Sequence, residues 1–187
     1  MRAGLLGGTF DPIHLGHLRA AENAREALAL DRVAFVPAAQ PPHRPPPVSS
    51  ARDRFAMVAL ATAGHSAFYP SDAELEREGP SYTVDTLRAW RALRPQDELV
   101  LVVGSDAFLE MGTWREAEAL FTLCTVAVVA RPGEALPPGP GPSVAVSGPG
   151  LQVSSSEVRR LLAAGQSVRY LVPEAVADYI EKRGLYR

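Results

Sequence analysis

Leu99-Val100-Leu101-Val102-Val103 is the stretch that decides the fold class, because all of its side chains are apolar. Strands that are covered on both faces have such continuous apolar runs, and these strands are typical of parallel sheets. Apolar segments alternate along the chain with segments of helical periodicity, and this alternation indicates βαβ units. We therefore expect an α/β fold with a doubly wound parallel sheet and helices on both of its faces.

The predicted elements follow one another as strand and helix over most of the chain, in the order of a Rossmann-like sheet. Strands are expected over Arg2–Leu6, Arg32–Val36, Ala67–Pro70, Leu99–Val103 and Thr125–Ala130, with a weaker one over Ser143–Ser147. Helices are expected over His17–Leu30, Ala51–Ala63, Thr83–Leu93, Trp114–Leu120, Ser155–Ala164 and Pro173–Arg183. Two proline-rich stretches, Pro37–Pro47 and Pro132–Pro149, are expected to be surface loops, and the first to be a binding loop.

The composition is that of a globular protein, with 187 residues, 47% hydrophobic and 21% charged. We expect one domain over residues 1–187, with a small C-terminal helical part from about residue 151. The net charge of −2 gives no broad basic surface for nucleic acid, and no apolar run approaches the roughly 20 residues that cross a bilayer. We expect neither a nucleic acid nor a membrane as partner, and a cytoplasmic location. The single cysteine, Cys124, excludes an internal disulfide, and its apolar surroundings favour a packing role.

A glycine-rich segment, Gly7-Gly8-Thr9-Phe10-Asp11-Pro12-Ile13-His14-Leu15-Gly16-His17, directly follows the first predicted strand. Two glycines after a strand allow a tight turn and a close approach of the backbone to a ligand. His14 and His17 are three residues apart near a helix start, so both side chains are expected on one side of it. From the residues alone three interpretations stay open: a phosphate-binding site, half of a zinc site, and two structural histidines in a solvated turn.

A second segment near the other end of the chain, Ser154-Ser155-Ser156-Glu157-Val158-Arg159, opens a predicted helix. Ser154 and Glu157 have the spacing of a capping box, which by itself predicts only a well-started helix. Ser155, Ser156 and Arg159 add hydroxyls and a guanidinium to the N–H groups of the first turn. These groups suit the β- and γ-phosphates of a nucleotide, so we expect both segments to bind one polyphosphate.

The first segment resembles the Gly-Gly-x-Phe-Asp-Pro-x-His-x-Gly-His signature of the nucleotidyltransferase superfamily with HxGH motifs. The second resembles the Ser-Ser-Thr-x-x-Arg-like element of that superfamily, with Ser156 where Thr is usual. This resemblance implies a single nucleotidyltransferase domain in which His14, His17 and Arg159 are catalytic and His17 contacts the α-phosphate. It also implies an ATP site formed by both motifs and by the end of the most apolar strand, namely by Gly7, Gly8, Thr9, Phe10, His14, His17, Gly104, Asp106, Ser154, Ser155, Ser156 and Arg159.

Segments between the two motifs carry the information on the acceptor: Pro41-Pro42-His43-Arg44, Gly79-Pro80-Ser81-Tyr82-Thr83, Gly104-Ser105-Asp106 and Trp114. Each segment also has a structural interpretation. The first could be a solvated loop, and in the second Ser81 or Thr83 could be a helix N-cap. Asp106 could cap the next helix, and Trp114 could be a core residue. Together they resemble the bacterial nicotinate mononucleotide adenylyltransferases over essentially the full chain. The resemblance implies that Tyr82 and Thr83 bind the nicotinate carboxylate and that Trp114 stacks on the pyridine ring. The other residues that it implies for the mononucleotide are His43, Arg44, Asp106 and Arg131.

The activity implied by this resemblance is adenylyl transfer from ATP to nicotinate mononucleotide, which gives deamido-NAD and pyrophosphate. Mg²⁺ would enter with ATP, and the protein itself would hold no metal directly. One alternative is another small-molecule adenylyl- or cytidylyltransferase, such as a phosphopantetheine enzyme, although these typically have Thr where His14 stands. A non-catalytic nucleotide-binding module is the other, and the intact His14, His17 and Arg159 argue against it. The sequence is compatible with a homo-oligomer but does not specify one.

Overall fold

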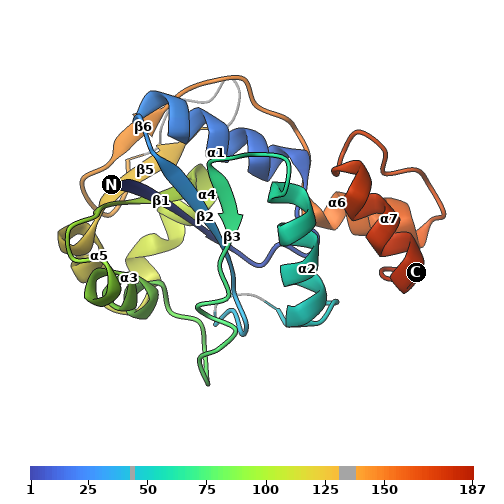
Figure 1. The fold of residues 1–187 in the computed structure, drawn as a ribbon, viewed down its shortest axis with the longest axis horizontal. Helices are drawn as coiled ribbons and strands as arrows, with labels where there is room; N and C mark the ends of the chain where they lie inside the picture. The colour runs from blue at the N-terminus through green and yellow to red at the C-terminus, as the bar shows by residue number, and fades with distance from the viewer. Residues whose placement is uncertain (43–44, 131–137) are drawn as a thin grey trace.

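A computed structural model describes residues 1–42, 45–130 and 138–187 of the chain. Within these residues, parallel strands form one six-stranded sheet in the order β3-β2-β1-β4-β5-β6 (Figure 1). The strands are β1 (Arg2–Gly8), β2 (Arg32–Pro37), β3 (Phe68–Pro70), β4 (Glu98–Gly104), β5 (Thr125–Val129) and β6 (Val144–Val146). The chain builds one half of the sheet outward from β1 through β2 to β3, and the other half outward from β4 through β5 to β6. The sheet is therefore doubly wound, and the expected fold class is confirmed.

Helices cover both faces of this sheet. They are α1 (Leu15–Ala27), α2 (Ala51–Thr62), α3 (Thr83–Leu93), α4 (Ser105–Glu110), α5 (Ala117–Leu123), α6 (Ser155–Ala163) and α7 (Glu174–Arg183), with a 3₁₀ turn, η1 (Met111–Thr113). One core cluster contains the buried side chains of α1 and α2, and a second contains those of α3, α4 and α5. The two clusters lie on opposite faces of the sheet, because alternate residues of its strands belong to one and to the other.

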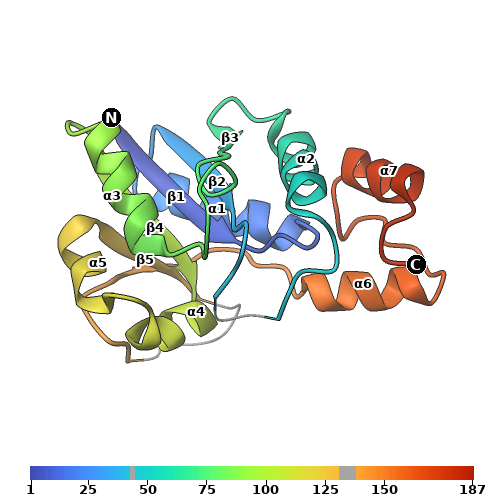
Figure 2. The ribbon, with the colours of Figure 1, turned by 90° about the horizontal axis from the view of Figure 1, so that it is seen from below.

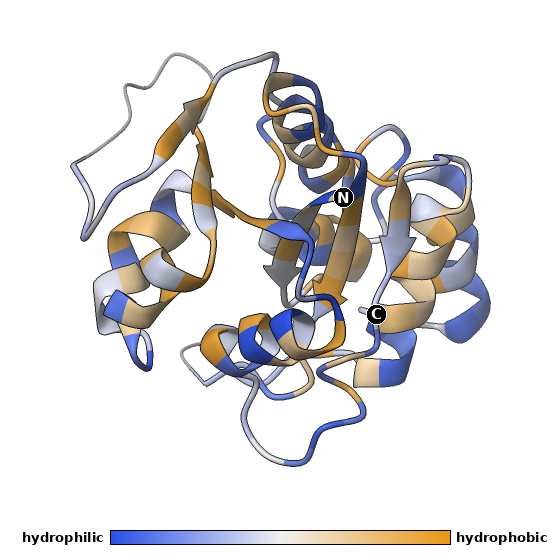
Figure 3. Ribbon diagram, turned by 60° about the vertical axis from the view of Figure 1, so that its left-hand side comes forward, coloured by the Kyte–Doolittle hydropathy of each residue, from blue (hydrophilic) through white to orange (hydrophobic). Residues whose placement is uncertain are grey.

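The position of β4 between two cores explains why Leu99–Val103 is apolar throughout. Val100 and Val102 belong to the core under α1 and α2, whereas Leu99, Leu101 and Val103 belong to the core under α3 and α5. A strand buried on both faces has no position for a polar side chain. In Figure 3 several strands are largely orange, whereas the helices carry both orange and blue segments.

The C-terminal helices lie together at one end of the molecule. Figures 1 and 2 both show α6 and α7 next to α2 and remote from α3 and α5. Val158 of α6, Ile180 of α7 and Tyr186 all enter the core cluster that α1 and α2 form. Apolar burial therefore holds the second sequence motif, which opens α6, close to the helix that follows the first motif.

The prediction of a helix over Trp114–Leu120 is wrong at its start. It also missed the short helix and the 3₁₀ turn that come before Trp114. The chain forms α4 directly after β4, then η1, and Trp114 is extended with φ −74° and ψ 154°. Glu116 adopts a left-handed conformation with φ 51°, and α5 begins only after it. Cys124 is buried between α5 and β5, where burial raises the pKa of its thiol to about 11 and confirms its packing role.

No helix in the described parts of the chain combines the length with the apolar character that crossing a bilayer requires.

Candidate active site

A cavity of about 440 Å³ lies where β1 and β4 end, at the point where the winding of the sheet changes direction. Gly7, Gly8 and Thr9 line it on the side of β1, and Gly104-Ser105-Asp106 line it on the side of β4. Open parallel sheets bind their ligands at this switch point, beyond the carboxyl ends of the strands. The sheet topology therefore places the cavity where a nucleotide is expected.

Phe10 lies next to Gly8 and His17, two residues that line the cavity. Its side chain is buried in the core, its ring contacts the His17 ring edge-on at 5.0 Å, and it does not line the cavity. A Cβ on Gly8 would lie 3.0 Å from the Phe10 ring, so a larger residue at this position would require the ring to shift. Phe10 also has φ 50°, a strained conformation that its packing maintains.

The two histidines of the first motif form a stacked pair at the start of α1. His14 is the N-cap residue, His17 is the third residue of the helix, and their ring centroids are 3.6 Å apart. The backbone N–H of His14 donates to Nδ1 of His17 at 3.2 Å. An Nδ1 that accepts leaves the proton of a neutral imidazole on Nε2, so we assign His17 as a donor at Nε2. His17 lines the cavity and His14 lies behind it, buried.

Both histidines are neutral at pH 7. Burial lowers the pKa of His14 to about 4. Burial and the proximity of His14 lower the pKa of His17 well below the usual value. A neutral His17 donates one hydrogen bond to an anion and does not change charge across the physiological pH range.

Gly16 lets the two rings stack. A Cβ there would lie 3.0 Å from Nδ1 of His14 and 3.0 Å from Cγ1 of Val153. Val153 directly precedes the second motif, so the glycine also admits the segment that leads into α6. The spacing of histidine, glycine and histidine thus has a packing reason in addition to a chemical one.

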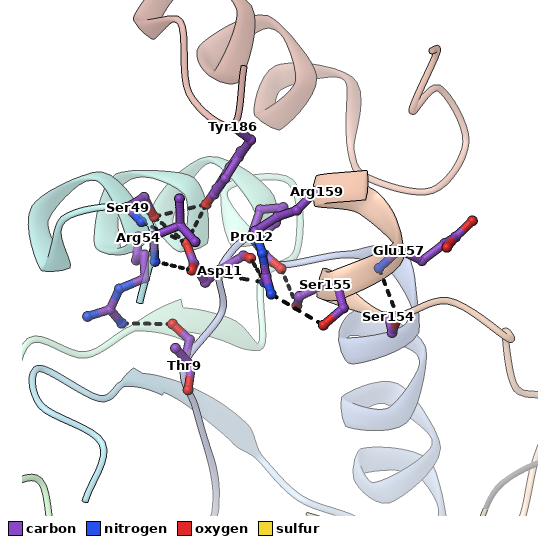
Figure 4. Close-up of polar contacts among 12 residues, drawn as sticks. Thr9, Asp11, Pro12, Ser49, Arg54, Ser154, Ser155, Glu157, Arg159 and Tyr186 are labelled. Carbon is purple, nitrogen blue, oxygen red and sulfur yellow. Dashed lines mark hydrogen bonds and ion pairs between the residues drawn. The ribbon is translucent and has the colours of Figure 1, made fainter. Parts of the chain in front are cut away.

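The second motif is bonded to the first (Figure 4). Ser155 Oγ donates to the carbonyl of Pro12 at 2.8 Å, and Arg159 Nη1 donates to the carbonyl of Asp11 at 2.6 Å. Arg159 Nη2 also donates to Ser156 Oγ at 3.3 Å. The first turn of α6 therefore lies against the loop between β1 and α1, although Arg159 is 148 residues from Asp11 in sequence. The two motifs come together, while Ser154, Ser155, Ser156 and Arg159 lie beside the cavity rather than in its lining.

Only half of the predicted capping box forms at α6. Ser154 Oγ accepts from the backbone N–H of Glu157 at 3.1 Å, as expected. The Glu157 carboxylate pairs with Arg160 instead, with oxygen–nitrogen distances of 2.7 and 3.0 Å. The carboxylate is thereby turned along the helix and away from its N-terminus, where it would compete with an anion.

Asp11 anchors the loop of the first motif. Its buried carboxylate accepts from Ser49 Oγ at 2.5 Å, Tyr186 OH at 2.6 Å and the N–H of Val48 at 2.7 Å (Figure 4). Burial alone would raise the pKa of Asp11, but these hydrogen bonds outweigh it and the pKa is lowered. The charged carboxylate therefore joins the first motif to the end of the proline-rich loop and to the C-terminal segment.

Tyr82, Thr83, Asp106 and Trp114 all line the cavity. Tyr82 is the N-cap residue of α3 and makes no side-chain cap, so neither Ser81 nor Thr83 caps this helix. Asp106 lies in the first turn of α4, whose N-cap is Gly104. Trp114 packs partly against the core under α3 and α5 and also faces the cavity. His43, Arg44 and Arg131 lie outside the described residues.

Ser81 joins the proline-rich loop to the turn before α3. Its hydroxyl accepts from the N–H groups of Ala39 at 2.9 Å and Gln40 at 3.3 Å, and its own N–H donates to the Gln40 carbonyl at 2.9 Å. The start of the loop, at Ala38 and Pro41-Pro42, lines the cavity together with this turn. The two segments therefore form one continuous wall.

Sequence reasoning missed two buried charged residues that shape the cavity. Glu74 lines it and accepts from Thr86 Oγ1 at 2.6 Å, and burial raises the pKa of its carboxyl. Arg54, which is 1% exposed, donates to the carbonyls of Thr9 at 2.7 Å and Ala39 at 3.2 Å. Neither residue belongs to a motif, and only the folded chain brings their partners together.

Arg115 and Glu110 also line the cavity and were missed. The only signal for Arg115 was its position directly after Trp114. No three His, Cys, Asp or Glu side chains within the described ranges come together as a metal-binding group.

Comparison with known proteins gives a family for this geometry. The family described as Cytidylyltransferase-like matches residues 5–161. A protein of Thermus thermophilus with the curated name "Probable nicotinate-nucleotide adenylyltransferase" is 55% identical over 187 residues, covering 100% of both chains. A protein of the same name from Geobacter metallireducens is 44% identical, covering 100% of this chain and 98% of its own.

A solved structure shares the fold. It is "Plasmodium falciparum nicotinic acid mononucleotide adenylyltransferase complexed with NaAD", with a TM-score of 0.82, 20% identity and coverage of 99% of this chain and 97% of that chain. At this identity the likeness concerns the fold alone. From the family match and the full-length relatives it follows that the chain belongs to the Cytidylyltransferase-like family and, within it, to the nicotinate-nucleotide adenylyltransferases.

Proposed function

We propose that the cavity transfers the adenylyl group of ATP to nicotinate mononucleotide, giving deamido-NAD and pyrophosphate in NAD biosynthesis. Family membership supports this reaction, since the full-length relatives carry the name nicotinate-nucleotide adenylyltransferase. The observation that carries the proposal for this chain is the pair of hydrogen bonds from Ser155 and Arg159 to the loop before α1. They bring a helix N-terminus and a guanidinium to the same loop that presents His17.

ATP extends, in this proposal, from the cavity toward the first turn of α6. Gly7, Gly8 and Thr9 let the backbone approach the phosphates, and His17 Nε2 donates to the α-phosphate. The β- and γ-phosphates lie against Ser154-Ser155-Ser156 and Arg159, where free N–H groups of the helix, hydroxyls and the guanidinium attract anions. Asp106 and Gly104 meet the nucleosides at the end of β4. His14 acts through His17, whose ring it orients by stacking and by its backbone N–H.

The mononucleotide occupies the wall formed by the turn before α3 and by Trp114. Trp114 stacks on the pyridine ring, and Tyr82 and Thr83 bind the nicotinate carboxylate. The family resemblance assigns His43, Arg44 and Arg131, which lie outside the described residues, to binding of the mononucleotide. These assignments rest on the family resemblance and on the position of Tyr82, Thr83 and Trp114 around one cavity.

The reaction needs no general base. A 5′-phosphate has a second pKa of about 6, so at pH 7 it is mainly a dianion. Its oxygen attacks the α-phosphorus, the new P–O bond forms, and the bond between the α-phosphorus and the bridging oxygen breaks to release pyrophosphate. Alignment of the two substrates supplies on the order of 7–11 kcal/mol, which exceeds the roughly 3–4 kcal/mol of one preorganised donor. Mg²⁺ would enter bound to ATP, and it would supply charge neutralisation for the leaving pyrophosphate.

A pyrophosphate-release assay tests the proposal. ATP is offered with nicotinate mononucleotide, nicotinamide mononucleotide or phosphopantetheine in parallel reactions, each with and without Mg²⁺. We expect the fastest release with nicotinate mononucleotide and formation of deamido-NAD in equal amount. Release with phosphopantetheine alone, or ATP binding without release for any acceptor, would refute the proposal.

A further inference from the structure

The described lining of the cavity is poor in positive charge. It contains the carboxyl groups of Glu74, Asp106 and Glu110, but Arg115 is the one Lys or Arg among the described residues that line it. His17 adds no charge, because its pKa lies well below the usual value. An acceptor that carries a carboxylate meets a wall with three acidic groups, so the position of this one guanidinium matters for its binding.

Arg115 lies between η1 and α5, and its side chain reaches the first turn of α3. Its guanidinium carbon is 4.8 Å from the centroid of the Tyr82 ring, and Nη1 donates to Asp85 Oδ2 at 3.4 Å. Tyr82 is the N-cap residue of α3, and Asp85 is three residues further along. Arg115 also follows Trp114 directly in the chain. The guanidinium is therefore held beside the two aromatic side chains that face the acceptor part of the cavity.

The ion pairs of Arg115 are long, and its side chain is 51% exposed. Its nitrogens are 3.4 Å from Asp85 and 3.9 Å from Glu116, whereas a charge-assisted N–H···O bond measures about 2.7–2.9 Å. Glu116 is bound more closely by Arg88, at 2.6 Å. The Arg115 guanidinium can therefore turn toward a ligand without breaking a short ion pair.

We infer that Arg115 is a specificity-determining residue, whose side chain selects the nicotinate form of the mononucleotide over the nicotinamide form. This inference rests on the proposed function, which places the pyridine ring at Trp114 and Tyr82. The acid and the amide have nearly the same shape, and at pH 7 they differ by one negative charge. Shape alone therefore separates them poorly, whereas a cation beside the ring stabilises the carboxylate and not the amide.

Arg115→Gln tests the inference, with Arg115→Lys as the charge-conserving variant. Arg88→Gln is the matched control, because Arg88 pairs with the same Glu116 but does not line the cavity. For each protein, kcat and KM are measured by pyrophosphate release with ATP and either mononucleotide, at low and high salt. Thermal unfolding checks that all variants are folded.

We expect Arg115→Gln to raise KM for nicotinate mononucleotide about three- to tenfold, as for a partly exposed charged contact, with KM for ATP unchanged. The preference for the acid should fall by the same factor, and its salt dependence should weaken. Arg115→Lys should keep most of the preference, and Arg88→Gln all of it. An unchanged KM for the acid, or equal losses for acid and amide in a folded variant, would overturn the inference and leave the proposed function intact. No release with either mononucleotide by the unmodified protein would overturn both.

Discussion

Substitutions of His17 can separate the two hydrogen bonds of this side chain. Nδ1 accepts the N–H of His14 at 3.2 Å and caps α1, whereas the assigned Nε2–H faces the cavity. His17→Asn places an amide near Nδ1 and removes the distal donor, and His17→Gln places an amide N–H near Nε2 and removes the cap. His17→Ala removes both. The three variants therefore distinguish a catalytic donor from a structural cap.

The expected magnitudes follow from these two contacts. Loss of one preorganised donor to the α-phosphate costs about 3–4 kcal/mol of transition-state stabilisation, which lowers kcat about 10²–10³-fold. Loss of a helix cap costs about 1 kcal/mol of stability. We expect His17→Asn and His17→Ala to show the full loss of kcat, and His17→Gln a smaller one. Only the Gln and Ala variants should lose about 1 kcal/mol of unfolding free energy.

Pyrophosphate release and urea unfolding measure the two effects on the same preparations. KM for nicotinate mononucleotide serves as the internal control, because His17 is assigned to ATP and should leave it largely unchanged. An Asn variant with near wild-type kcat would refute the role of Nε2 as a donor to the α-phosphate. A large loss of stability in that variant would show instead that the loss of rate has a structural cause.

Further predictions concern the packing and protonation of the site. Trp114→Ala should raise KM for the mononucleotide and leave KM for ATP nearly unchanged. A defect in KM for ATP alone would show that Trp114 does not belong to the mononucleotide pocket. Gly16→Ala should lower kcat, because the added methyl group displaces the His14 ring. It should cost at most about 2 kcal/mol of unfolding free energy, because about 1 kcal/mol of helix propensity offsets part of the roughly 1–3 kcal/mol of overpacking; unchanged kcat would contradict this. Tyr186→Phe removes a 2.6 Å hydrogen bond to the Asp11 carboxylate and should cost about 1.5–3 kcal/mol in urea unfolding, and a cost near zero would show that the bond adds no stability. His14 has a folded pKa of about 4 against 6.5 unfolded, so the unfolded chain binds more protons between these values. Unfolding free energy should therefore be full above pH 6.5 and fall by up to about 3 kcal/mol toward pH 4, and a flat urea midpoint from pH 7 to 5 would exclude this.

The sheet could be predicted from the sequence because each strand is an apolar run that needs no knowledge of its neighbours. The region after β4 could not. Helix α4 has 6 residues and η1 has 3, which is too short for a helical period to emerge. The start of α5 depends on the left-handed conformation of Glu116, and glutamate gives no signal for that conformation.

The candidate site likewise contains residues that the sequence could predict and residues that it could not. His14, His17, Ser155 and Arg159 stand in local motifs, so their proximity could be expected before any contact was known. The anchors of these motifs could not, because Asp11 is 175 residues from the Tyr186 hydroxyl that binds it. The packing of α7 and the C-terminal segment brings such long-range partners together. No periodic pattern in the sequence predicts these contacts.

The hydroxyl of Ser81 has a consequence for any attempt to give this enzyme a different acceptor. Because it holds the backbone of Ala39 and Gln40, the proline-rich loop and the turn before α3 share one set of hydrogen bonds. A chimera that transplants only one of these segments from another enzyme breaks the part-buried hydrogen bonds that join the two. Changes of acceptor scope, whether in the laboratory or in evolution, therefore have to exchange both segments as a pair.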